Sequence, residues 1–205
     1  MNLENERLKQ KLSTNLIVID NFYDDPYKIR EFAMKQTYTT HEYHPGERTE
    51  SFATEKHREI FNKILEPFSG KITIFDLSKE ENSNGAFQYN TSNDIKSWIH
   101  VDNYNTNWAG IVYLTPNAPV SAGTGFFKFK DGNINAFDSN LLNNENYVDN
   151  NCRDNTKWEL VSSVGNLFNR LVLFNSTQYH MSLNYFGDNI DNARLMQVFF
   201  FTTES

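Results

Sequence analysis

The chain has 205 residues, of which 39% are hydrophobic, with 19 basic and 26 acidic side chains and a net charge of −7. This length is typical of one domain with a sizeable core, and we expect a single domain over residues 1–205. The acidic balance argues against a general nucleic-acid binder, because affinity for phosphates needs clustered Lys and Arg. A single cysteine, Cys152, excludes an intrachain disulfide and favours a reducing, cytoplasmic compartment.

The N-terminal part, residues 1–85, is expected to be a helical support with the first strands. The polar start is unlike a signal peptide, and no apolar run approaches membrane-spanning length, so we expect no membrane association. A cap at Asp25 and Pro26 at the first helical position predict a helix over about 26–37. A second helix is predicted over 54–68, with Gly70 at its end. Strands are predicted at 16–20 and 71–75, and residues 38–51 are predicted to be a loop.

The pattern from residue 86 onward indicates β-structure, with short apolar runs separated by turn residues. Strands are predicted at 86–90, 100–102, 108–114, 125–130, 169–174 and 194–202. Helices followed by about eight strands predict a mainly β protein with N-terminal helices, a double-stranded β-helix or cupin-like jelly roll.

Residues 133–164 are too long for an ordinary connection within this predicted core over 86–205. We expect an insertion that is either a lid or disordered, with helix around 155–164. Its aromatic residues Tyr147 and Trp158 are candidates to close the mouth of the barrel over a substrate.

The stretch that carries chemistry is 97–103, in which His100 and Asp102 are separated by one residue. If this stretch is a strand, both side chains point to the same face. An imidazole and a carboxylate there are two of the three ligands of a 2-His-1-carboxylate triad, the usual site of non-haem Fe(II) oxygenases. His180 is the candidate third ligand. A rival metal pair, His41 and His44, lies in the predicted loop without a third ligand close by and is better interpreted as solvated.

Several further positions complete a family pattern. In chain order they are Tyr89, His100, Val101, Asp102, Asn103, Tyr113, Leu114, Gly123, Gly125, Phe129, Leu173, Phe174, His180 and Arg194. Over about residues 86–202 this order resembles the Fe(II)- and 2-oxoglutarate-dependent oxygenases, and within them it is most similar to the prolyl-4-hydroxylase branch.

The resemblance implies a dioxygenase that couples decarboxylation of 2-oxoglutarate to hydroxylation of a C–H bond with O2. It implies that His100, Asp102 and His180 are the catalytic metal ligands for Fe(II). It further implies that Arg194 neutralises the 5-carboxylate of 2-oxoglutarate, with Tyr113 and Tyr89 as additional contacts. Strand alternation places Arg194 on one face with Met196 and Val198, and a lone inward cation there needs an anion.

Two other classes stay open at this point. One is a cupin-like protein that binds a metal without oxygenase activity, and the other is an interaction module with a decayed site. An anion clamp at Arg194 weighs against the first, and an intact triad weighs against the second. The sequence does not specify the substrate, which could be a peptide, an amino acid or another small molecule, and it does not indicate an oligomeric state.

Overall fold

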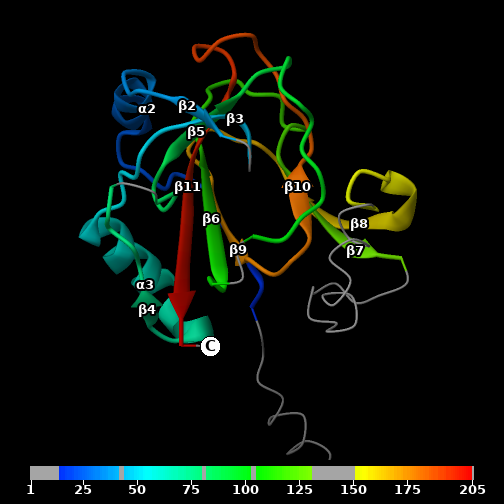
Figure 1. Cartoon of the computed structure of the whole chain (residues 1–205). Helices are drawn as coiled ribbons and strands as arrows, with labels where there is room; N and C mark the ends of the chain where they lie inside the picture. Colours follow the sequence, from blue (N-terminus) through cyan, green and yellow to red (C-terminus); the bar gives the residue numbers. More distant parts are fainter. Residues whose placement is uncertain (1–13, 42–43, 80–81, 103–104, 131–150, 205) are drawn as a thin grey trace, which may run out of the picture.

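The computed structural model describes residues 14–41, 44–79, 82–102, 105–130 and 151–204. Two antiparallel sheets and two helices make up this part of the chain (Figure 1). The described residues include no helix with the length and apolar character needed to cross a membrane.

The large sheet contains eight strands and provides the inner wall on which the site is built. Its main path is β1-β9-β6-β11-β5-β3-β2, and β4 also pairs with β11. In that order the bounds are β1 (Leu16–Ile19), β9 (Leu171–Asn175), β6 (Trp108–Tyr113), β11 (Arg194–Thr203), β5 (Phe87–Asn90), β3 (His44–Arg48) and β2 (Thr39–His41), with β4 at Ile72–Ile74.

The small sheet packs on one face of the large sheet. It has the order β10-β7-β8, with β10 at His180–Ser182, β7 at Thr124–Phe129 and β8 at Trp158–Val164. Buried side chains from both sheets share one cluster, including Phe126 of β7, Phe174 of β9 and Met196 of β11. The central strands of the large sheet are therefore buried on both faces, which explains their nearly continuous apolar sequence.

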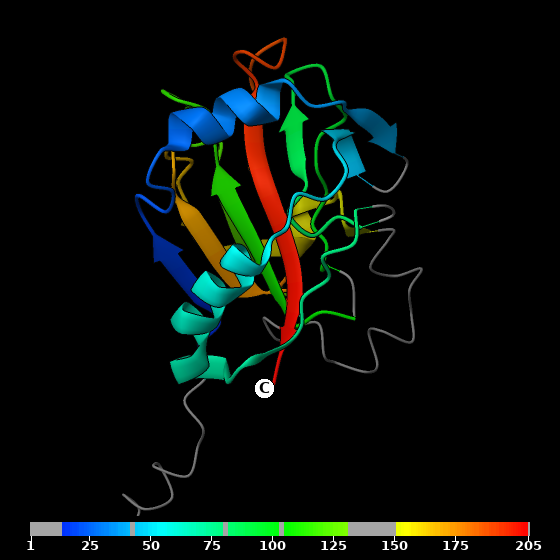
Figure 2. The ribbon, with the colours of Figure 1, turned by 90° about the vertical axis from the view of Figure 1, so that its left-hand side faces the viewer.

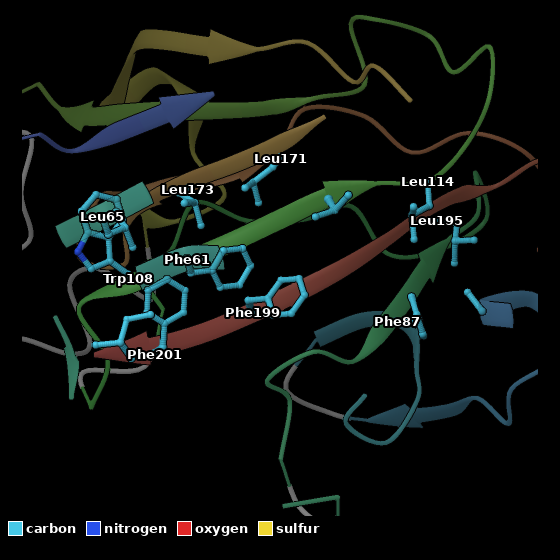
Figure 3. Packing of buried hydrophobic residues seen from close by; sticks show 13 residues of the cluster. Phe61, Leu65, Phe87, Trp108, Leu114, Leu171, Leu173, Leu195, Phe199 and Phe201 are labelled. Carbon is cyan, nitrogen blue, oxygen red and sulfur yellow. The ribbon is translucent and has the colours of Figure 1, made fainter. Parts of the chain in front are cut away.

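Both helices cover the other face of the large sheet (Figure 2). Helix α2 (Pro26–Met34) begins after Asp25, whose side chain accepts a hydrogen bond from the backbone N–H of Lys28. Helix α3 (Glu55–Ser69) begins with a capping box formed by Thr54 and His57. Figure 3 shows Phe61 and Leu65 of α3 packed with large side chains of the sheet, so this layer fixes the outer face.

Two predictions about secondary structure outside the predicted metal site are wrong. The segment predicted as a loop over 38–51 contains strands β2 and β3, which pair with each other and extend the large sheet at β5. The segment predicted as helix over 155–164 is a short 3-10 helix, η1 (Asn155–Lys157), followed by strand β8. Its exposed middle has two adjacent apolar residues, Leu160 and Val161, and lacks the alternation that would have marked it as a strand.

Trp158 belongs to a core cluster, which contradicts its predicted role as a closing residue. Its side chain is 5% exposed and packs against Phe129 and Tyr179. Most of the predicted insertion, including Tyr147, lies outside the described residues.

Candidate metal and cosubstrate site

The three predicted metal ligands lie together on the inner side of the large sheet. One ligand atom each from His100, Asp102 and His180 falls within 4.8 Å of the other two. Nε2 of His180 is 3.5 Å from Oδ2 of Asp102, and Nε2 of His100 is 3.9 Å from Oδ1. The structure therefore confirms that these residues converge.

His100 is positioned by a β-bridge and not by a strand, which corrects the predicted strand at 100–102. The segment around it is extended, and His100 forms an isolated antiparallel bridge with His180 of β10. The backbone N–H of Asp102 donates to the carbonyl of Ser176 at 2.9 Å. The extended backbone still places His100 and Asp102 on one side, as the one-residue spacing predicts.

Both imidazole rings are oriented by backbone carbonyls. Nδ1 of His100 lies 2.8 Å from the carbonyl oxygen of Trp98, and Nδ1 of His180 lies 2.9 Å from that of Gln178. Since a carbonyl only accepts, each Nδ1 carries the proton and each Nε2 presents a lone pair. Metal-binding histidines commonly have this arrangement, in which the ring nitrogen that does not face the metal donates to a fixed acceptor.

The charge of the site also fits a cation. Burial and the neighbouring His180 ring lower the pKa of His100 to about 4, so its ring is neutral at pH 7. Oδ2 of Asp102 is buried and accepts no hydrogen bond from the described residues. An orphaned carboxylate oxygen between two lone pairs is costly without a bound cation. Two imidazoles and one carboxylate are the ligand set of many non-haem Fe(II) sites.

Arg194 lies on the same inner face and is fully buried. Its Nε donates to the carbonyl of Ala122 at 3.1 Å, and its guanidinium lies 5.4 Å from the ring centroid of Tyr113. Among the described residues, its Nη2 has no hydrogen-bond partner. The Tyr113 hydroxyl, also buried, is 2.7 Å from Oγ1 of Thr124. A buried guanidinium with an unpaired nitrogen beside a hydroxyl can receive a carboxylate.

Tyr89 lies on the wrong face of the sheet for its predicted role. In the pairing of β5 with β11, Tyr89 is opposite Leu195, and both contribute to the cluster under the helices. Its hydroxyl donates to Oε1 of Glu47 at 2.6 Å. The prediction that Tyr89 contacts the cosubstrate is therefore not supported by its position.

Two cavities share lining residues at His100 and Asp102. An inner cavity of about 110 Å³ is lined by all three candidate ligands, and a wide outer cleft of about 1440 Å³ is lined by His100 and Asp102. Their shared wall includes His44 and Arg48 of β3. The former rival metal residue His44 is therefore near the site without being one of the converging ligands.

Three residues of this site were missed in the sequence. Arg48 and Gln88 face the cavities from β3 and β5, and Tyr185 reaches the inner cavity from the loop at 184–192. Burial raises the pKa of the Tyr185 hydroxyl, and the charge of Arg194 acts in the opposite direction. Strand β5 is buried on both faces, so its sequence gives no signal for Gln88, and nothing in the sequence of β3 marks it as a strand.

Comparison with solved structures shows a shared fold at low sequence identity. HygX from Streptomyces hygroscopicus, solved with nickel and 2-oxoglutarate bound, matches with a TM-score of 0.59 and 11% identity, covering 100% of this chain and 88% of HygX. A prolyl-4-hydroxylase from Pseudomonas putida matches with a TM-score of 0.52 and 11% identity over 93% of this chain and 94% of that chain. The viral collagen prolyl hydroxylase of Paramecium Bursaria Chlorella virus-1 gives 0.50 and 12%, over 93% and 91%.

These matches confirm, at the level of fold, the resemblance to prolyl-4-hydroxylases and their relatives. No curated protein matches the sequence. The Family of unknown function (DUF6445) matches residues 2–184.

Proposed function

The chain belongs to the Family of unknown function (DUF6445), and from its site we propose that it is an Fe(II)- and 2-oxoglutarate-dependent dioxygenase that hydroxylates a C–H bond. One observation carries this proposal. A convergent His-Asp-His triad lies on the same sheet face as a buried arginine with an unpaired nitrogen. The triad supplies the ligands that a metal ion requires, and the arginine supplies the positive charge that neutralises the 5-carboxylate of 2-oxoglutarate.

Each residue has a defined task in this proposal. His100, Asp102 and His180 would hold Fe(II) through the two Nε2 atoms and the carboxylate. Arg194 and the Tyr113 hydroxyl neutralise the far carboxylate of the cosubstrate. When bound, Fe(II) with 2-oxoglutarate and O2 supplies the oxidant for a C–H bond, and the cosubstrate leaves as succinate and CO2.

The protein's own contribution is geometry and exclusion of water. The apolar rings of Phe126 and Phe174 pack against His180, with Phe174 at a centroid distance of 4.6 Å. They keep one side of the triad dry, which strengthens the electrostatic contacts inside.

The fold supports this proposal, since we take the two sheets to be a jelly roll like that of its structural neighbours. HygX has been solved with hygromycin B as well as 2-oxoglutarate, and other neighbours are prolyl hydroxylases. The substrate class, peptide or small molecule, is thus not set by the fold. The outer cleft has room for either.

The alternative is a cupin-like metal-binding protein without oxygenase activity. Its triad would be the same, but a metal-only site gives no reason for a buried cation with an unpaired nitrogen. Arg194 therefore favours the oxygenase.

Anaerobic titration separates the two functions. Fe(II) is added to the protein, followed by 2-oxoglutarate, and the visible absorption is recorded. A metal-to-ligand charge-transfer band on addition of 2-oxoglutarate is expected, with no band in Asp102→Ala. Binding of Fe(II) without any band would favour the metal-only alternative. Failure to bind Fe(II) would contradict both.

A further inference from the structure

Another cation, Arg48, is half-buried and faces the site from β3, two strands away from β11. It lines both the inner cavity and the outer cleft together with His100 and Asp102. Strand pairing sets Arg48 beside Gln88, Gln88 beside Met196, and Met196 beside Tyr113. These four residues form one row across β3, β5, β11 and β6, on the face that carries the site.

The guanidinium of Arg48 is held by neutral groups. Its Nε donates to Oε1 of Gln88 at 3.0 Å, Nη2 donates to the same oxygen, and Nη1 donates to Oγ of Ser83 at 2.9 Å. Three of its five N–H donors are used within the described residues, which leaves one on each terminal nitrogen. A guanidinium with a remaining N–H on each terminal nitrogen can donate to a carboxylate.

Arg48 also lacks an ion-pair partner in the part of the chain that the structure describes. Glu47 points to the other face and accepts from Tyr89, and Glu50 pairs with Lys79 at 3.9 Å. Burial lowers the pKa of Arg48 to about 10, and Asp102 is the acidic group that opposes this shift. At neutral pH Arg48 is still charged.

Arg48 and Arg194 do not serve the same anion. Their strands are two positions apart in the sheet, or roughly 10 Å at about 4.8 Å per strand. Arg194 turns away from β3 toward Tyr113 on β6, whereas Arg48 is fixed to Gln88 on β5. If Arg194 takes the cosubstrate, Arg48 has another ligand.

The net charge of the site with Fe(II) and 2-oxoglutarate bound indicates the charge of the group that Arg48 binds. The charges of Fe(II) and Arg194 are matched by those of Asp102 and the two carboxylates of 2-oxoglutarate. Arg48 is left as one uncompensated, partly desolvated positive charge beside the reaction centre. A single negative charge on a planar group, a carboxylate, matches the excess better than a phosphate near −2.

We propose that the protein acts on a substrate that carries a carboxylate, and that Arg48 binds this group in the outer cleft. This inference rests on the proposed function, because it takes the triad and Arg194 to be occupied by metal and 2-oxoglutarate. Arg48 then fixes which C–H bond of the substrate lies over the triad. Free amino acids, peptide C-termini and acidic side chains share this chemistry.

The test measures binding of small carboxylates to the full chain loaded with Mn(II) and 2-oxoglutarate. Paramagnetic relaxation of acetate reports binding near the metal, and acetamide is the neutral control of the same shape. Wild type should bind acetate saturably and acetamide much more weakly. Arg48→Gln should weaken acetate binding by about tenfold or more, and Arg48→Lys should recover part of it because the charge is restored.

Lys79→Gln is the matched control, since Lys79 lines the same outer cleft but already pairs with Glu50. It should change acetate binding by less than about twofold. Glycine and N-acetylglycine then separate the sources: tighter binding of glycine favours a free amino acid, and tighter binding of N-acetylglycine favours a peptide C-terminus.

Mn(II) and 2-oxoglutarate affinities are measured in every variant. Equal acetate binding in wild type and Arg48→Gln, or none in wild type, would overturn this inference while leaving the oxygenase proposal intact. Loss of Mn(II) or 2-oxoglutarate affinity in Arg48→Gln would also overturn it, because Arg48 would then serve the metal site. Absence of Mn(II) binding in wild type would instead count against the proposed function.

Discussion

The backbones of His100 and His180 hydrogen-bond to each other in both directions, although the two residues are far apart in the chain. The N–H of His100 donates to the carbonyl of His180 at 3.0 Å, and the reverse bond is 2.8 Å. The ring centroids lie 4.5 Å apart. The spacing of these two candidate metal ligands is therefore fixed by a backbone bridge, independently of a metal.

Removing a triad ligand should abolish tight metal binding without unfolding the chain. We expect Asp102→Ala and His180→Ala to weaken Fe(II) binding by at least about 100-fold, more than changes to outer-shell residues usually do. His44→Ala, which removes a cavity-lining histidine outside the triad, should bind Fe(II) within about threefold of wild type. Anaerobic calorimetry measures all three affinities. Near-normal binding in both triad variants would refute the site.

Substitution of Arg194 should weaken the binding of 2-oxoglutarate and leave the binding of the metal ion unchanged. Truncating one partner of a buried charge pair costs roughly 2–5 kcal/mol, so Arg194→Met should raise the 2-oxoglutarate requirement about 30-fold or more at tenfold per 1.4 kcal/mol. Thermal stabilisation of the Mn(II)-loaded protein by 2-oxoglutarate is the readout, since a bound ligand raises the melting temperature. Arg170→Met is the control, because Arg170 pairs with Asp20. An unchanged response in Arg194→Met would exclude the clamp.

Two tyrosines on opposite faces of the large sheet should differ in their effect on 2-oxoglutarate binding. Tyr113→Phe should weaken 2-oxoglutarate binding severalfold, because a hydroxyl near Arg194 is lost. Tyr89→Phe should leave it unchanged, because the Tyr89 hydroxyl bonds Glu47 on the opposite face. Titration of 2-oxoglutarate into each Mn(II)-loaded variant compares them. Equal losses in both would place the cosubstrate elsewhere.

The packing of α3 predicts a large difference between two phenylalanines of the same helix. Phe61 is 0% exposed and stacks against Phe201 at 5.4 Å, whereas Phe68 is 48% exposed. Phe61→Ala should lower the free energy of unfolding by about 3–5 kcal/mol, and Phe68→Ala should lower it by under about 1 kcal/mol. Urea denaturation measures both. Similar losses would mean that α3 does not pack as described.

His57 should make the fold sensitive to mild acid. Burial, with Lys56 adding to it, lowers the pKa of His57 to about 4, below the value of about 6.5 expected when unfolded. Nδ1 accepts from the backbone N–H of Thr54, and Nε2 lies 3.1 Å from the hydroxyl of Tyr23, which donates to Gln197. The neutral ring is thus part of the folded network.

The sign of this effect follows from proton uptake. Between these pKa values the unfolded chain binds the proton and the folded chain does not, so stability is full above about pH 6.5 and falls as pH drops toward 4. His57→Gln should flatten this part of the urea midpoint profile relative to wild type. Identical slopes from pH 7 to 4 in the two proteins would remove His57 as the cause.

Periodicity predicted the elements whose two faces differ, and it placed two of the three candidate metal ligands side by side. One-residue spacing placed His100 with Asp102, and alternation placed Arg194 with Met196; both results depend only on backbone geometry. Tyr89 shows the limit. Strand β5 is buried on both faces, so its sequence does not reveal that Tyr89 faces the helices and Gln88 faces the site.

Arg48 could not be found because its strand exists only through pairing. The sequence of β3, His-Pro-Gly-Glu-Arg, has low strand propensity and no alternation. It becomes a strand by hydrogen-bonding to β2 and β5. The position of Arg48 therefore depends on pairing between segments that are far apart in the sequence. The local sequence pattern of β3 does not indicate this pairing.

The carbonyls that orient His100 and His180 have a consequence for how this site can change over evolution. Trp98 and Gln178 act through their main chains, and every amino acid offers the same carbonyl. Substitutions at these two positions can therefore accumulate without altering which ring nitrogen faces the candidate metal site. In sites where a carboxylate side chain does this work, its loss would remove the orientation. The orientation of both imidazole rings thus depends on the backbone conformation at Trp98 and Gln178. Substitutions around the triad should preserve that orientation as long as the backbone conformation is kept.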